Sequence, residues 1–398
     1  MVYPDKERKE RALSWGVEEI FVRESLEKKI ESGDLLRVKL GIDPTSPNIH
    51  LGRAIVLWKL REFQDLGHTV VFIVGDFTAR IGDPSDKLEK RPTLSLEEIK
   101  KNIKTYRAQV GKIIDLKKAE FHFNSRWLSR LKFAEIAELA ECFSVQQMSH
   151  RRNFAERMER GEEISLREFL YPLMQGYDSV KVSADVEVGG FDQLFNLKAG
   201  RLIQKHYGKK EQDIVVCQML EGTDGRKMSS SWGNVINVSD SPEDMFGKVM
   251  SIRDELIPKY LNLCARAGEE EVNSFKKEIS SGTNPRDLKM RLAGKIVALY
   301  HGEKKASRAN KNFTKTFQKK EIPKKAEEII VDIGTPLGDA LLNAGAVSSR
   351  SEFNRLREAG AIENMTKGEK ITKERPVVDG PMALRIGKRR FVKIITKK

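Results

Sequence analysis

Cysteine and long apolar runs are both scarce in this sequence of 398 residues. Its three cysteines, Cys142, Cys217 and Cys264, form neither a CxxC pair nor an even disulfide set, which indicates a reducing compartment and argues against a structural zinc. The most apolar run, residues 69–75, is too short to cross a membrane and predicts a buried strand. Because the first residues are charged and lack a signal-peptide core, we expect a soluble cytoplasmic protein with no membrane partner.

Familiar phosphate-binding and nucleophile motifs are also missing. There is no GxxxxGK(S/T) Walker loop, no GxGxxG after a strand and no Ser/His/Asp elbow. What the chain does have is positive charge, with 72 basic against 58 acidic residues and a formal net charge of +14. Such an excess favours a polyanionic partner, which can be nucleic acid, an anionic membrane or a nucleotide. Charge alone does not choose among them.

The stretch from Leu36 to Gly52, LRVKLGIDPTSPNIHLG, predicts a strand, a tight loop and a helix. Prolines end the strand after Asp43, and apolar residues recur at helical spacing from His50 onward. The helix N-terminus then lies at the carboxyl edge of the strand, where its free N–H groups suit a phosphate. A second strand at 70–74 completes a right-handed βαβ unit. The alternative is a plain turn with a solvent-facing histidine.

The remaining pattern predicts an α/β fold with three regions. Residues 1–240 predict a Rossmann-like parallel-sheet domain with an inserted helical connective segment. Besides the βαβ unit, this domain contains a helix at Val17–Ile30 and further strands at 121–123, 182–188 and 214–220. Strands disappear after Ser241, so residues 241–325 predict an α-helical domain and a basic linker. Residues 335–398 predict a small α+β module.

Three loops that follow strand ends carry most of the polar candidates. Neighbouring parallel strands bring such loops together, and their pooled cations, hydroxyls and histidine suit phosphates. The candidates are Asp43, Thr45 and His50 in the first loop, Asp83, Lys87 and Arg91 in the second, and Arg226, Lys227 and Ser229 to Ser231 in the third.

One otherwise apolar helix carries a polar stripe. Tyr171, Gln175 and Asp178 stand at i, i+4 and i+7, on one face of the helix. A polar stripe of this composition on a segment that is otherwise apolar needs a reason. The alternative is a solvent-facing stripe on a surface helix.

Two short motifs carry a family resemblance. PNIHLGR resembles the HIGH motif of class I aminoacyl-tRNA synthetases, and the distant GRKMSSS resembles their KMSKS motif. Between them, GDFTARIGDPSDKLEKR, YPLMQGYDSVKV and VGGFDQLFN resemble stretches of bacterial tyrosyl-tRNA synthetases. The C-terminal module, with AVSSRSEFNRLREAGAI and GKRRFVKI, is similar to an RNA-binding domain of a ribosomal small-subunit protein.

The resemblance implies roles for individual residues. Thr45 and His50 would bind the outer phosphates of ATP, Lys87 and Arg91 would grip pyrophosphate, and Lys227 would belong to the loop that closes on the phosphates. The implied ATP-binding set is Gly41, Asp43, Thr45, His50, Gly52, Arg53, Asp192, Lys227, Met228, Ser229 and Ser230. The implied tyrosine-binding set is Lys39, Asp83, Tyr171, Gln175, Asp178 and Gln193, with Asp178 on the phenol. The implied tRNA-binding set is Arg350, Arg355, Arg357, Lys388, Arg389 and Arg390.

The implied activity has two steps. Tyrosine and ATP give tyrosyl-adenylate and pyrophosphate, and the adenylate is passed to the terminal ribose of tRNA(Tyr). The resemblance also implies Mg²⁺ with ATP, no dedicated metal site, no tightly bound cofactor, an anticodon-binding role for residues 241–325 and a homodimer.

Three positions depart from the family pattern. Arg53 replaces the last histidine of HIGH, Ser230 replaces the second lysine of KMSKS, and Lys39 stands where many bacterial relatives have a tyrosine facing the substrate hydroxyl. Two alternatives therefore stay open. One is a tryptophanyl-tRNA synthetase, which shares the fold and motifs; the other is a catalytically weakened RNA-binding paralogue.

Overall fold

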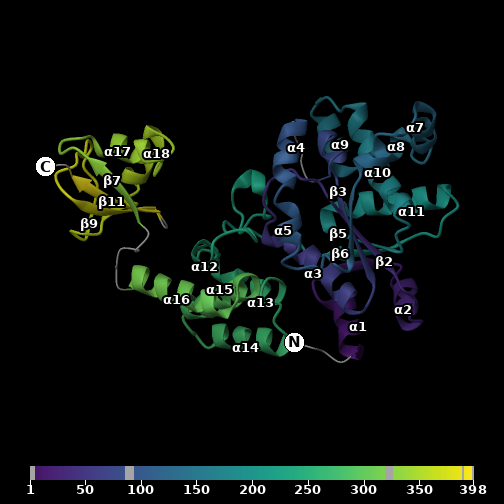
Figure 1. The fold of residues 1–398 in the computed structure, drawn as a ribbon, viewed down its shortest axis with the longest axis horizontal. Coiled ribbons are helices and arrows are strands. Elements are labelled where there is room, and N and C mark those ends of the chain that lie inside the picture. The colour runs from purple at the N-terminus through teal and green to yellow at the C-terminus, as the bar shows by residue number, and fades with distance from the viewer. Residues whose placement is uncertain (1–4, 86–93, 319–325, 388–389, 397–398) are drawn as a thin grey trace. The chain divides into compact units, whose positions relative to one another are not determined.

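The computed structural model describes residues 5–85, 94–318, 326–387 and 390–396. Figure 1 shows the fold of the chain, which divides into two compact units. The first comprises residues 1–240 and 251–292, and the second comprises residues 241–250 and 293–398.

A six-stranded sheet forms the centre of the first unit, in the order β1-β6-β5-β2-β3-β4. Its strands are β1 Val17–Phe21, β2 Arg37–Ile42, β3 Thr69–Val74, β4 Ala119–Phe123, β5 Val186–Gly190 and β6 Asp213–Cys217. The strands from β6 to β4 pair in parallel, and β1 joins the edge of β6 antiparallel. The predicted α/β fold with a Rossmann-like sheet is confirmed.

The helix predicted at Val17–Ile30 is wrong in its first part. Residues Val17–Phe21 form β1, and the helix α2 begins only at Arg23 and ends at Glu31. Gly16 and Val22 have φ near +63°, so the backbone turns sharply on both sides of β1. The pairing of Phe21 with Ile214 supplies hydrogen bonds from β6 that a local helical pattern cannot reveal.

The direction in which the chain adds strands to the sheet reverses between β2 and β5. This switch point determines which face of the sheet each connecting helix covers. The chain moves from β2 to β3 through helix α3 (Leu51–Asp65) and from β5 to β6, in the opposite direction along the sheet, through α11 (Leu194–His206). Right-handed crossovers in opposite directions place α3 and α11 on opposite faces of the sheet. Ligands bind at the carboxyl ends of the strands beside such a switch point.

The long helix α10 (Leu166–Lys181) packs against α11 on the same face. Its inner side joins a buried apolar cluster that includes Leu173, Tyr177, Val180 and Ile203. The remaining helices of the first unit are α1 Asp5–Ser14, α4 Leu96–Ile103, α5 Tyr106–Val110, α6 Ser125–Leu128, α7 Phe133–Ala140, α8 Val145–Ser149, α9 Arg152–Glu159, α13 Ile257–Leu263 and α14 Glu269–Ser280.

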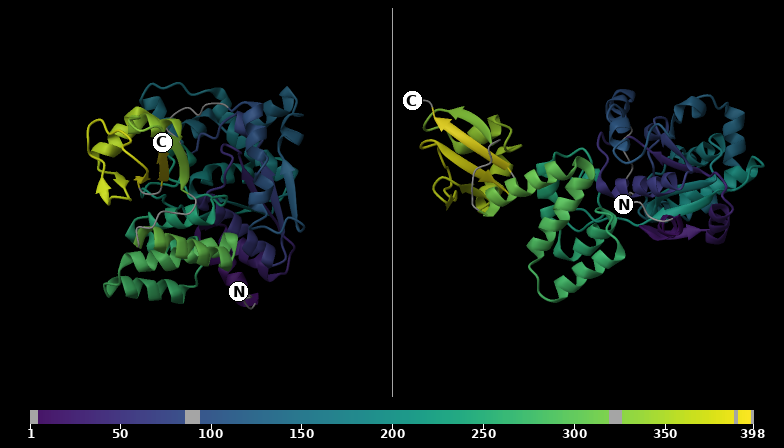
Figure 2. Two further views of the ribbon diagram at one scale, coloured as in Figure 1. Left: turned by 60° about the vertical axis from the view of Figure 1, so that its left-hand side comes forward. Right: turned by 60° about the horizontal axis from the view of Figure 1, so that its bottom comes forward.

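The second unit contains helices followed by a small sheet. The helices are α12 Pro242–Met250, the end of α15 (Pro285–His301), α16 Glu303–Gln318, α17 Leu337–Asn343 and α18 Arg350–Glu358. The sheet has the order β7-β11-β10-β8-β9, with β7 Glu327–Val331, β8 Ile362–Asn364, β9 Glu369–Lys370, β10 Met382–Ile386 and β11 Arg390–Thr396. The core of this part lies between α17, α18 and the strands, and it includes Leu341, Phe353, Leu384 and Ile394. The strands are drawn in yellow-green to yellow in Figure 2.

The basic segment after residue 303 is folded as far as the structure describes it. Helix α16 packs against α12, and the ring centroids of Phe246 and Phe313 lie 5.3 Å apart. In the described ranges, no helix has both the length and the apolar character needed to cross a membrane.

Candidate active site

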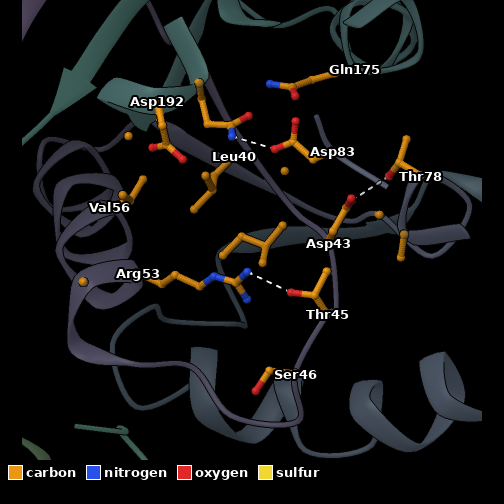
Figure 3. A pocket seen from close by; sticks show the side chains of 18 of the residues that line it. Leu40, Asp43, Thr45, Ser46, Arg53, Val56, Thr78, Asp83, Gln175 and Asp192 are labelled. Atoms are coloured by element: carbon orange, nitrogen blue, oxygen red, sulfur yellow. Dashed lines mark hydrogen bonds between the residues drawn. The ribbon is translucent and has the colours of Figure 1, made fainter. Parts of the chain in front are cut away.

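A cavity of about 540 Å³ opens at the carboxyl ends of β2, β3, β5 and β6. It is lined by the loops that follow these strands and by one face of α10. Every described residue of the predicted ATP-binding set lines it, and so do all the predicted tyrosine-binding residues except Lys39. Loops separated by up to about 180 residues in sequence are thus brought together, as Figure 3 shows for Asp43, Asp83 and Asp192.

The loop after β2 is tied to the start of α3 by Arg53. Its guanidinium donates to the Thr45 hydroxyl at 3.1 Å and to the Tyr106 hydroxyl at 3.3 Å. Tyr106 in turn donates to the Ser46 carbonyl at 3.0 Å, so the proline-containing loop is held from two sides. Figure 3 shows Arg53 pointing toward Thr45. Tyr106 was not among the site residues predicted from the sequence.

His50 caps the N-terminus of α3. Its Nδ1 accepts the Arg53 backbone N–H at 3.3 Å, and the ring is buried against the cavity wall. Burial, together with the charges of Arg53 and Lys227, lowers the pKa of His50 to about 3. A neutral ring whose Nδ1 is an acceptor carries its proton on Nε2. His50 is therefore a neutral N–H donor at physiological pH.

Asp43 is fixed by two hydroxyl donors. Thr78 donates to its Oδ1 at 2.6 Å and Tyr171 to its Oδ2 at 2.9 Å. Gly75 makes this arrangement possible, because a Cβ there would lie 2.0 Å from Asp43 Oδ1. The carboxylate thus links the ends of β2 and β3 to α10.

Asp83 lies at the centre of a second polar cluster. Gln193 donates to its Oδ2 at 2.7 Å, Ser85 donates to the same oxygen at 2.7 Å, and Asn196 donates to Oδ1 at 3.3 Å. The structure therefore brings together Asp83 and Gln193, which are 110 residues apart in sequence. Both line the cavity near the Tyr171 and Gln175 face of α10.

Asp178 is buried at the wall of the cavity. Trp127 donates to its Oδ1 at 2.7 Å, and Asn124 donates to its Oδ2 at 3.2 Å. Burial raises its pKa to about 7, against the opposing effects of the Lys39 charge and these two donors. Asn124 and Trp127 were missed from the sequence, because nothing in the segment after β4 marks them as partners of a helix some 50 residues later.

The structure does not bring Lys39 to the cavity, which corrects its predicted place among the tyrosine ligands. Its side chain is fully buried, and its ammonium forms an ion pair with Glu187 at 2.9 Å. The same Nζ donates to the Gln175 carbonyl at 2.9 Å and to the Ser179 hydroxyl at 2.8 Å. Lys39 therefore lies behind the wall that Gln175 and Glu187 present to the cavity.

The GRKMSSS loop forms a further part of the cavity lining. Lys227 forms an ion pair with Asp192 at 3.1 Å, and the Gly52 N–H approaches the Met228 sulfur at 3.4 Å. The buried Asn234 side chain fastens this loop, since it donates to the Lys227 carbonyl and accepts from the Ser229 N–H. Asn234 is a further residue that the motif comparison did not single out.

The other predicted residues fall elsewhere. Lys87, Arg91, Lys388 and Arg389 lie outside the described residues. Arg350 and Arg355 are exposed on α18, and Arg390 is exposed at the start of β11. Arg357 is buried and donates to the Lys373 carbonyl at 2.9 Å, so the structure contradicts its predicted exposure to RNA phosphates.

Comparison with known proteins agrees with this site. The family model described as tRNA synthetases class I (W and Y) matches residues 31–318, and the chain belongs to this family of aminoacyl-tRNA synthetases. A protein of Thermotoga maritima named tyrosine–tRNA ligase is 47% identical over 392 residues, which cover 98% of this chain and 97% of that protein. A protein of the same name from Carboxydothermus hydrogenoformans is 47% identical over 94% of this chain and 93% of its own length. The predicted resemblance to tyrosyl-tRNA synthetases is confirmed.

Solved structures support the fold. The tyrosyl-tRNA synthetase of Archaeoglobus fulgidus, complexed with L-tyrosine, matches with a TM-score of 0.62 at 22% identity over 77% of this chain and all of its own. The tryptophanyl-tRNA synthetase of Plasmodium falciparum matches with a TM-score of 0.58 at 14% identity, over 78% of this chain and 89% of its own. At these identities the likeness shows a shared fold.

Proposed function

We propose that this chain is a tyrosine–tRNA ligase, which activates L-tyrosine with ATP and transfers it to the 3′ end of tRNA(Tyr). One observation carries the proposal beyond the family: a single cavity joins a phosphate-binding end to a buried carboxylate suited to a phenol. Thr45, His50 and Lys227 line the first end, and Asp178 lines the second. The names and near-complete coverage of the relatives support the same assignment.

The first step needs positioning and charge neutralisation. The tyrosine carboxylate attacks the α-phosphorus of ATP, the bond to the bridging oxygen breaks, and pyrophosphate leaves with that oxygen. The protein supplies no covalent nucleophile for this step. Neutral His50 donates through Nε2 to a phosphate oxygen, and Lys227 offers positive charge to the leaving pyrophosphate.

The amino acid is held at the other end of the cavity. Asp83, fixed by Gln193 and Asn196, and the Tyr171 and Gln175 side chains receive the ammonium group, with Gln193 beside the carboxylate. Asp178 accepts a hydrogen bond from the phenolic hydroxyl. Asp192 takes the ATP ribose, which requires its present partner Lys227 to move toward the phosphates.

The ATP enters with Mg²⁺ as its counter-ion. Among the described residues, no group of three or more His, Cys, Asp or Glu side chains could hold a metal. Mg²⁺ commonly retains several waters and binds through substrate phosphates. We therefore assign it to the substrate.

The remaining parts serve tRNA and assembly under this proposal. Residues 241–325 contact the anticodon, and the 335–398 module meets RNA phosphates through Arg350, Arg355 and Arg390. A homodimer is supported by exposed apolar side chains at the starts of α7, α8 and α10, namely Phe133, Val145 and Leu166. We also propose that the enzyme works in the cytoplasm.

Amino-acid-dependent ATP–pyrophosphate exchange tests the function. The assay is run with tyrosine, tryptophan and phenylalanine, and we expect exchange with tyrosine alone at low substrate concentration. Exchange driven only by tryptophan would identify the protein as a tryptophanyl enzyme. Loss of exchange with every amino acid, while tRNA still binds, would identify an RNA-binding paralogue.

A further inference from the structure

A buried ion pair lies directly behind the cavity wall. Lys39 of β2 and Glu187 of β5 are register partners in the parallel pairing of these strands. Their side chains are 0% and 1% exposed, and Nζ and Oε1 are 2.9 Å apart. Burying two charges costs several kcal/mol per ion unless each is fully hydrogen-bonded. The burial of such a pair next to a binding cavity indicates that it has a role in the site.

The pair is hydrogen-bonded to one turn of α10. Lys39 Nζ donates to the Gln175 carbonyl and the Ser179 hydroxyl, at 2.9 and 2.8 Å. Glu187 accepts from the Gln175 amide at 3.1 Å and from the Ser179 hydroxyl at 3.0 Å. Asp178 stands within this turn, so the pair fixes the depth at which its carboxylate meets the cavity.

The pair also determines the charge around Asp178. The charges with the largest effects on its pKa are Lys39 of β2, which lowers it, and Glu187 of β5, which raises it. Its hydrogen-bond donors, Asn124 and Trp127, do not titrate at physiological pH. His122 lies against the Trp127 ring with the centroids 6.0 Å apart, and its partner is Glu120. Lys39 is therefore paired with one buried carboxylate, Glu187, and its charge favours the ionised form of a second, Asp178.

We propose that Lys39, paired with Glu187, is a positioning residue that sets amino acid specificity: it holds the Gln175–Ser179 turn, and its charge acts on the Asp178 carboxylate that accepts the phenolic hydroxyl. It acts through Asp178 and does not touch the substrate. This inference rests on the proposed function, because it needs tyrosine as the substrate.

The pH dependence of discrimination separates this role from simple packing. The readout is the ratio of kcat/KM for tyrosine to that for phenylalanine in ATP–pyrophosphate exchange, from about pH 6 to about pH 9. Titration of ATP and pyrophosphate cancels in this ratio, since both amino acids use them. In the unsubstituted protein the ratio rises with the ionisation of Asp178, whose pKa is about 7.

Three variants move this profile in different directions. Lys39→Met raises the pKa of Asp178 and shifts the midpoint upward by roughly one pH unit, so the ratio at neutral pH falls roughly five-fold. Glu187→Gln removes a negative charge and shifts the midpoint downward. The double variant Lys39→Met/Glu187→Gln leaves neither buried charge unpaired, which favours folding, and shifts the midpoint upward by less than Lys39→Met.

Lys59→Met is the matched control. Lys59 is also fully buried, and its ammonium donates to the Arg11 and Ala12 carbonyls, away from the residues that line the cavity. We expect it to lower the melting temperature without moving the profile. A profile of Lys39→Met or the double variant that coincides with that of Lys59→Met would overturn the inference. Failure of the proposed function looks different, since the unsubstituted protein would then show no tyrosine-dependent exchange.

Discussion

Replacing Gly75 with alanine tests the packing beneath the cavity. The added Cβ would lie 2.0 Å from Asp43 Oδ1 and 2.3 Å from Thr78 Oγ1, so both short side chains must move away. Overpacking of this kind costs about 1–3 kcal/mol, and each hydrogen bond that Asp43 loses adds about 1 kcal/mol or more. With two hydroxyl donors at stake, we expect a total loss of ~2–5 kcal/mol in the free energy of unfolding.

Tryptophan fluorescence during denaturant unfolding measures this loss in the right part of the chain. All four tryptophans lie within residues 1–240, so the signal reports on the first unit. The KM for tyrosine should rise as well, because Asp43 carries the bond to Tyr171. Gly268→Ala is the control within the first unit: its Cβ would meet nothing within 4 Å, its φ is −70°, and we expect a change below about 1 kcal/mol in the free energy of unfolding.

A double variant sharpens the test. Thr78→Ala removes one of the two clashing atoms, so the cost of Gly75→Ala should be smaller in that background. A Gly75→Ala protein with wild-type kcat/KM and a loss below about 0.5 kcal/mol would refute the packing argument.

Three further predictions follow from the site. Asp178→Asn should lower the Tyr/Phe ratio in exchange. The folded pKa of Asp178 is about 7, above an unfolded value near 4, so the free energy of unfolding of the unsubstituted protein should fall relative to that of the variant as the pH rises from about 4 to about 7. Equal pH dependence of unfolding in the two proteins would contradict this burial. Lys227→Met should lower the exchange rate by about 10²–10³-fold while changing stability by less than about 1 kcal/mol, because its ion pair with Asp192 is partly exposed; a comparable loss of stability would assign Lys227 a structural role. Deletion of residues 335–398 should preserve exchange and impair tRNA charging, and parallel loss of both would argue against separate roles.

The core of the fold could be predicted from the sequence because apolar periodicity and turn residues within short stretches mark its strands and helices. The strand–loop–helix at residues 36–65 follows from apolar periodicity and two prolines, and the structure gives β2 and α3 at that place. The edge strand β1 could not be predicted in the same way. Its residues fit a helical period, and only pairing with β6, some 200 residues later, makes them a strand.

The site shows the same division. Motif residues such as Thr45 and Lys227 were found because their neighbours in sequence mark them. Asn124 and Trp127 became visible only when tertiary structure placed them on Asp178. Lys39 was assigned to the substrate because the family resemblance places it where many bacterial relatives have a tyrosine. Its burial is decided by Glu187, which faces it from a strand formed almost 150 residues later.

Arg53 shows how a HIGH-like motif can work with an altered last residue. Its guanidinium orders Thr45 and Tyr106, while its backbone N–H fixes the ring of His50. Its charge also contributes to the low pKa of His50, which leaves that histidine neutral. The positive charge on this side of the cavity therefore comes from Arg53, and His50 contributes a directed N–H. Under the proposed function, the substitution keeps a phosphate donor at position 50 and adds a permanent cation one helical turn later.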